Sequence, residues 1–216
     1  MNQITKRILI YILGTFLLGI GVTFSIKADL GVSPVSSLGY AIALITSISV
    51  GTAVFLSNIV FIAAQVILSR QFEAKNYFLQ LLSAILVSAF IDVTLALGVF
   101  LPDATTWTLQ VGYLIISLFI IAFGVFFYVN ARLPLASYDA LVPVVAKKFK
   151  LSFGKAKTRC DLINVALSAI ICLVFIQSFG SIGIGTFIAA YFTGKIVGVI
   201  IKYFKAPLYN WLSFPL

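Results

Sequence analysis

The chain contains 216 residues, of which 62% are hydrophobic and only 10% are charged, and its mean hydropathy is +1.15. Because a soluble domain has about 25% charged residues, this composition excludes a water-soluble globular protein and indicates a lipid environment. The net charge of +9 does not indicate a nucleic-acid partner, because basic cytoplasmic loops are its ordinary cause in a membrane protein.

The sequence contains no histidine, and its two cysteines, Cys160 and Cys172, lie in one apolar segment. On a helix they would be separated by roughly 18 Å along the axis, which is too far for a disulfide. We therefore expect no metal site and no cofactor. Without histidine, a catalytic cysteine environment or paired carboxylates on one face, no chemistry can be assigned, and we expect that the protein is not an enzyme.

Six apolar segments with few charges have about 20 residues each, the length that a helix needs to cross a bilayer. In chain order they are 8–27, 50–69, 77–100, 110–130, 160–178 and 181–201. Two further segments, 34–48 and 138–150, are too short or too basic to cross, and we expect short interfacial or re-entrant helices there. The sequence thus predicts an all-α polytopic membrane protein, a single domain over 1–216 with a cytoplasmic tail at 207–216.

The lysines and arginines fall on one side of these six spans. If the N-terminus is inside, Lys27 is the basic residue on the outer side and Lys195 lies within a span, while the other basic residues are all inside. This asymmetry predicts a multi-pass protein of the plasma membrane with both termini in the cytoplasm.

An internal repeat divides the chain into unit 1 (1–103) and unit 2 (104–206). A shift of 103 residues aligns 21–53 with 124–156 without a gap, and ten of these 33 positions are identical. Each unit has three spans, which is an odd number, so the second unit enters the membrane from the opposite side. This is the inverted-topology repeat that recurs in secondary transporters.

Three short motifs carry a family resemblance. They are Ala28-Asp29-Leu30-Gly31-Val32-Ser33-Pro34, Ala131-Arg132-Leu133-Pro134 with Asp139-Ala140-Leu141, and Gly183-Ile184-Gly185-Thr186. The chain resembles the YczE/YyaS/YitT-type group of bacterial integral membrane proteins, whose pattern is roughly A-x-L-G-x-x-P-x-D-x-L in each half. Here Ser36 replaces the first acid, while the second half keeps Asp139 but has Pro134 and Ser137 in place of glycine and proline. The resemblance implies a plasma-membrane protein suspected to be a transporter, and the departures argue against a site with two acids.

Two acidic residues lie within the predicted spans. Asp92 is surrounded by apolar residues in the third span, where a carboxylate costs about 2.5–3.5 kcal/mol unless it is paired, protonated or wet. Its repeat equivalent is Lys195, so we expect a buried ion pair across the repeat interface. The alternative is a solvated carboxylate near the outer interface. Asp161 begins the fifth span, and a local contact with Arg159 would explain it without any function.

Other candidate substrate-binding residues lie where helices are expected to break. Pro34 and Asp139 flank the junctions between a span and a short helix, and broken helices that meet at a repeat interface are the usual construction of a substrate site. The turn before the last span is a candidate anion-binding helix start, or alternatively a site of close helix packing. Its candidate residues are Gly183, Gly185 and Thr186.

The leading functional hypothesis is a small secondary transporter of an unknown small solute, with its site at the interface of the two units. The alternative is a partner-dependent membrane subunit, which captures substrate for a larger transporter or assists a larger complex. The expected surroundings are the lipid bilayer and a small-molecule substrate, with a homo-oligomer or a partner membrane protein as further alternatives and no nucleic acid.

Overall fold

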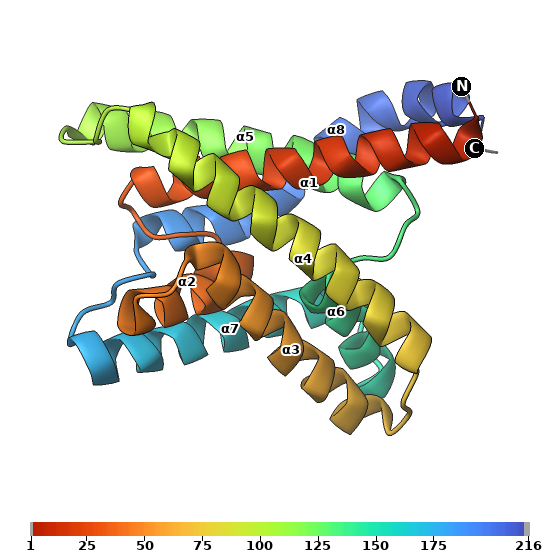
Figure 1. Ribbon diagram of the computed structural model, residues 1–216, viewed down its shortest axis with the longest axis horizontal. Helices are drawn as coiled ribbons and strands as arrows, with labels where there is room; N and C mark the ends of the chain where they lie inside the picture. The colour runs from red at the N-terminus through yellow and green to blue at the C-terminus, as the bar shows by residue number, and fades with distance from the viewer. Residues whose placement is uncertain (1, 214–216) are drawn as a thin grey trace.

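The computed structural model describes residues 2–213, in which every regular element is helical (Figure 1). The six long helices are α1 (Gln3–Lys27), α3 (Val50–Ser69), α4 (Ala74–Leu97), α5 (Trp107–Asn130), α7 (Phe153–Ile176) and α8 (Ile184–Leu212). The shorter elements are α2 (Pro34–Thr46), α6 (Ser137–Lys148) and the 3-10 turn η1 (Gly98–Phe100). All six long helices are apolar and long enough to cross a membrane, which confirms the predicted all-α class and indicates a multi-pass membrane protein.

Two helix boundaries differ from the sequence prediction by more than five residues. Helix α7 begins at Phe153 instead of 160, so that basic residues such as Lys155 lie in its first turns. Long basic side chains are tolerated at a helix end because they extend toward water. Helix α8 continues to Leu212, so most of the segment expected as a tail is helical, and Leu212 packs with buried residues of α1. Residues 214–216 of that tail lie outside the described residues.

The helices form two layers that α4 connects (Figure 1). Helices α1, α5 and α8 make one layer, and α2, α3, α6 and α7 make the other. Helices α1 and α5 run in opposite directions and their backbones touch: a Cβ atom on Gly14 would lie 2.5 Å from the Tyr128 nitrogen. Because the hydrophobic effect does not drive helices together in lipid, they associate through close packing at small residues such as these.

The structure repeats with the offset found in the sequence. Helices α2 and α6 begin at residues 34 and 137, and α3 and α7 begin at 50 and 153. Left-handed backbone occurs at Asp29 and at its equivalent Arg132, and again at Ser47 and its equivalent Lys150. The short helices take part in an exchange between the units, because α2 packs on α7 as well as on α3, and α6 packs on α3 as well as on α7. The two units are therefore interlocked and share one backbone plan from the end of their first helix to the start of their third, whereas α8 begins 110 residues after α4.

Both ends of the chain lie at the same end of the molecule (Figure 1). The Gln3 amide donates to the carbonyl of Ser213 (3.2 Å), and the Lys6 ammonium donates to the carbonyl of Trp211 (2.6 Å). The α3–α4 loop and the beginning of α7 lie at this end too. We call it the basic end; the far end holds the α1–α2 and α7–α8 connections.

Replacement of Gly14 by valine should lower the free energy of unfolding by about 1–3 kcal/mol, because the added side chain pushes α1 away from α5. Gly194→Val is the matched control, since a Cβ atom at Gly194 has no neighbour within 4 Å and the helix propensity changes equally. Thermal unfolding in detergent measures both. Equal melting temperatures for the two variants would contradict the packing of α1 on α5.

The orientation of the basic end stays a prediction that cysteine labelling can test. In a background with Cys160 and Cys172 replaced by serine, Lys155→Cys should react with a membrane-impermeant reagent only after the cells are permeabilised. Asp103→Cys, in the loop between α4 and α5 at the far end, should react in intact cells. The reverse pattern would place the termini outside.

Candidate functional site

A cavity of about 110 Å³ lies where the two units meet, bordered by helices α1 to α6. Five pairs of its lining residues are related by the 103-residue offset. The pairs are Leu18 and Ile121, Val22 and Val125, Ser33 and Ala136, Val35 and Tyr138, and Ser36 and Asp139. Because each pair has one member in each unit, the cavity lies at the repeat interface, where equivalent parts of the two units come together.

Both short helices begin beside this cavity, and side-chain amides of the opposite unit hold their first residues. At the start of α6, the Ser137 N–H donates to Oδ1 of Asn58 (3.0 Å), and Nε2 of Gln65 donates to the Ser137 carbonyl (3.0 Å). At the start of α2, Nδ2 of Asn164 donates to the Pro34 carbonyl (2.6 Å). The Asn58 amide satisfies an N–H group that a helix start leaves without a helical partner. Gln65 and Asn164 instead tie first-turn carbonyls of α6 and α2 to the opposite unit.

The carboxylate of Asp139 is the one acidic or basic side chain among the residues that line the cavity. It stands in the first turn of α6, where the helix dipole favours a negative charge. Within residues 2–213 it has no hydrogen bond and no ion pair. The neighbouring Asp161 is fully engaged, because Lys157 lies 2.5 Å away and the Tyr138 hydroxyl donates to it. The expected Arg159 contact is thus wrong: Lys157, one turn before Asp161, is its partner.

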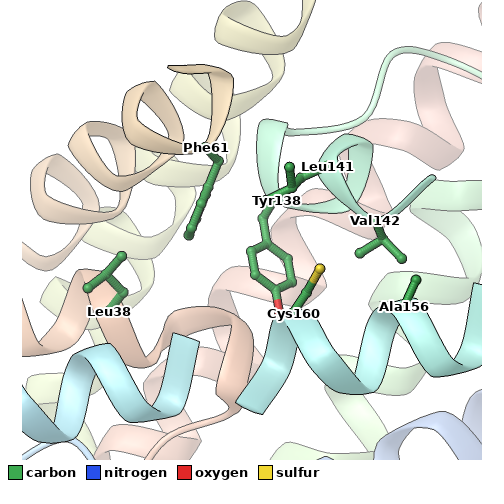
Figure 2. Close-up of a cluster of buried hydrophobic side chains, with 7 residues drawn as sticks. All are labelled: Leu38, Phe61, Tyr138, Leu141, Val142, Ala156 and Cys160. Atoms are coloured by element: carbon green, nitrogen blue, oxygen red, sulfur yellow. The ribbon is translucent and has the colours of Figure 1, made fainter. Parts of the chain in front are cut away.

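Tyr138 fixes the geometry next to Asp139 (Figure 2). Its ring comes from α6 and lies between Phe61 of α3 and Cys160 of α7. The rings of Tyr138 and Phe61 meet edge to face with centroids 5.0 Å apart, and the Lys157 ammonium lies 4.8 Å from the Tyr138 centroid. Locked in this way by three neighbours, Tyr138 orients the first turn of α6 and hence the carboxylate beside it.

Burial raises the pKa of Asp139, and the charge of Lys157 only partly opposes this. Helix α6 is not one of the six spanning helices. A carboxyl whose pKa is raised by folding favours the folded state when it is protonated. This contribution is present below the unfolded pKa and is lost as the pH rises through the folded pKa. Burial and the Asp161 carboxylate also raise the pKa of Tyr138, so its hydroxyl stays a donor.

The far end of the molecule is closed by backbone contacts between the α1–α2 and α7–α8 connections. The Val32 N–H donates to the Ser181 carbonyl (3.0 Å), and the Gly185 N–H donates to the Leu30 carbonyl (2.7 Å). A Cβ atom on Gly183 would lie only 2.4 Å from the Leu30 oxygen. The predicted turn before the last span therefore belongs to this closure, where glycine is needed for close approach.

The basic end is open instead, with a polar vestibule of about 600 Å³ between α3, α4 and α6. Gln65 and Gln80 line it and exchange two amide hydrogen bonds of 2.9 and 3.1 Å. Gln65 also bonds to Ser137, whose N–H bonds to Asn58 on the wall of the cavity. A continuous chain of polar groups thus connects the vestibule with the central cavity.

The expected ion pair between Asp92 and Lys195 is not formed. The Asp92 carboxylate accepts from the Gly51 N–H and from the Ser49 hydroxyl, each at 2.7 Å, and so caps the start of α3. Lys195 is exposed on α8 and lies 3.7 Å from the ring centre of Tyr191. The Asp92 carboxylate is therefore stabilised by the start of a helix, whose N–H groups need acceptors, and not by a cation.

The other predicted site residues are also separated. Asp139 lines the cavity, and Pro34 begins α2 between two lining residues. The residues of the turn before α8 lie at the far end, where the Thr186 hydroxyl accepts from the Gly183 N–H (3.2 Å). Those three residues are Gly183, Gly185 and Thr186.

Sequence reasoning missed the neutral polar groups of the cavity. These are the hydroxyls of Ser33 and Ser36, whose oxygens lie 3.0 Å apart, the Ser57 hydroxyl and the Asn58 amide. The repeat could have identified Ser36, because it occupies the position of Asp139 in the other unit. An amide inside an apolar span, as at Asn58, is a second usable signal, since it requires a partner in the bundle.

A family of unknown function, DUF6198, matches residues 5–202 of the chain. The chain belongs to this family. The region that matches DUF6198 begins in the first turn of α1 and extends into α8, so it includes nearly all of both units and the whole wall of the cavity. No curated protein and no solved structure matches the chain.

Removal of the cap at Asp92 should destabilise the protein without involving Lys195. We expect Asp92→Ala to cost about 1–2 kcal/mol through the lost acceptor at the start of α3, and Asp92→Asn, which keeps an acceptor oxygen, to cost less. Lys195→Met should have little effect. In a thermal-unfolding cycle, the stability lost by the double variant should equal the sum of the losses of the two single variants. A coupling energy above about 1 kcal/mol would show that the two charges meet.

Proposed function

We propose that the protein is a small secondary transporter of the plasma membrane, with its solute site in the cavity between the two units. The single observation that carries this proposal is a cavity lined by equivalent residues of both units and holding one carboxylate that has no hydrogen bond or ion pair within residues 2–213. In transporters built from inverted repeats, the solute binds between the units, beside helices that begin or end inside the membrane. Helices α2 and α6 are helices of this kind.

The difference between the two ends of the molecule supports the same function. A transporter exposes its site to one side at a time, so one end must be closed while the other is accessible. Here backbone hydrogen bonds close the far end, whereas a vestibule reaches the Gln65–Gln80 pair from the basic end. With the basic end in the cytoplasm, as the positive-inside rule favours, the vestibule faces inside, and the Gln65–Gln80 pair lies between it and the cavity.

The inverted arrangement of the units and the resemblance to the YczE/YyaS/YitT-type group belong to this proposal. The exchange of short helices between the units agrees with a two-fold axis in the membrane plane. Helices α1 and α5, which are equivalent, run in opposite directions side by side, as such an axis requires (Figure 1).

Metabolite profiling of cells tests the transport function. Cells that express the wild-type protein should differ from vector cells in the accumulation of at least one small solute. Asp139→Asn should slow the initial rate of transport of that solute about ten- to a hundredfold, because it removes a charged acceptor from the cavity. Asp103→Asn is the matched control, since that acid lies in an exposed loop and pairs with Lys27.

The proposal fails if no solute differs between wild-type and vector cells while the protein is present and monodisperse in detergent. It also fails if Asp103→Asn reduces transport as much as Asp139→Asn does, because the effect would then not come from the cavity.

A further inference from the structure

The charge of the cavity limits what it can bind. Asp139 is the one charged residue on its wall, and Lys157, the cation whose charge acts on it, is held by Asp161 at 2.5 Å. An ionised carboxylate accepts hydrogen bonds and donates none. In a cavity that is otherwise mostly apolar it needs a donor, preferably a cationic one, and the described residues provide none.

An anion would be a poor ligand, although two helix starts face the cavity and helix starts favour anions. The first N–H groups of α6 are already used: that of Ala136 donates to the Tyr128 hydroxyl, and that of Ser137 donates to Asn58. The Asp139 carboxylate stands beside them and would repel a negative ligand. The charge of this site therefore selects a cation.

A bare metal ion is also a poor ligand for these groups. Calcium takes six to eight oxygen ligands, and magnesium requires an octahedral set that includes one or two carboxylates. Within residues 2–213, no group of three or more acidic, cysteine or histidine side chains comes together. One carboxylate and a few hydroxyls suit a cation that brings its own hydrogen-bond donors, such as an ammonium group.

The rest of the wall favours an apolar body on that cation. Half of the lining residues are aliphatic, and aromatic rings are contributed by Phe61, Tyr128 and Tyr138. Aromatic faces attract ammonium groups through cation–π interactions. The cavity volume of about 110 Å³ is of the same order as the roughly 150 Å³ of an engineered cavity that takes up benzene, so the ligand should be no larger than about that ring.

We propose that the solute is a small organic monovalent cation, an ammonium group on a short aliphatic body, whose charge is bound by the Asp139 carboxylate. This inference rests on the proposed transport function and names the substrate class of the same site. The hydroxyls of Ser33 and Ser36 lie on the α2 side of the cavity and are available to accept further N–H donors. Because Ser36 is the equivalent of Asp139, the site can be tested by moving the carboxylate from position 139 to position 36.

Binding of n-butylammonium to the purified protein in detergent tests the inference, with n-butanol and butyrate as neutral and anionic probes of similar shape. We expect butylammonium alone to raise the melting temperature and to give a saturable binding isotherm. Asp139→Asn should weaken this binding about ten- to a hundredfold, as expected when a charged acceptor is replaced by a neutral one. Asp103→Asn should leave it unchanged.

The double variant Ser36→Asp with Asp139→Ser moves the carboxylate to the equivalent position of the other unit. If the cavity is one site shared by both units, the double variant should regain binding of butylammonium that Asp139→Ser alone loses. Melting temperatures without ligand show whether each variant is folded.

The outcomes separate the two proposals. Binding of butanol or butyrate as tight as that of butylammonium would overturn the cation inference, as would undiminished butylammonium binding by a folded Asp139→Asn variant. Absence of butylammonium binding to the wild-type protein would overturn it too. In each case the transport function would still stand if cell profiling finds a solute that depends on Asp139, and it falls only if that profiling finds none.

Discussion

The starts of α2 and α6 impose the constraint on which the rest of the structure depends. A helix that begins inside a bundle in lipid leaves backbone groups without water, so the protein must provide their partners. Here Asn58 accepts from the first N–H group of α6, while Gln65 and Asn164 donate to first-turn carbonyls of α6 and α2. Loss of the Asn58 amide would leave the buried Ser137 N–H unsatisfied at a cost of about 1–3 kcal/mol. Because each amide belongs to the opposite unit, the position of each short helix depends on contacts with the other unit.

The packing of the short helices across the two units also creates the cavity, and the side chains at their starts give the cavity one charge. Two equivalent helix starts that face each other across the interface bring equivalent side chains to the same space. The backbone is repeated, but the chemistry is not, because Ser36 stands on one side and Asp139 on the other. Two acids there would repel each other in an apolar surrounding. One acid leaves a single negative charge that a single positive partner can balance.

The fold was predictable because each span and the repeat carry local signals, including the serines that precede α3 and α7, Ser49 and Ser152. The predicted Asp92–Lys195 pair was wrong, because alignment of a repeat shows equivalence and not proximity. Equivalent residues come near each other only where both units border the same space, as Ser36 and Asp139 border the cavity. The hydroxyls and amides of the cavity carry no charge, so composition and spacing could not distinguish them from ordinary polar residues.

The two ends of the molecule differ for a reason that the sequence contains. Gly31, in the closed turn at the far end, has a φ of 90°, and its equivalent at the basic end is Pro134, whose ring holds φ near about −65°. The basic-end turn therefore cannot adopt the far-end geometry; the Pro134 carbonyl accepts from the Ser83 hydroxyl instead. Closure of the basic end has to come from side chains, and the Gln65–Gln80 pair lies where it is needed. A transport cycle in this protein would thus use two closures of different kinds, one made of backbone and one of exchangeable amides.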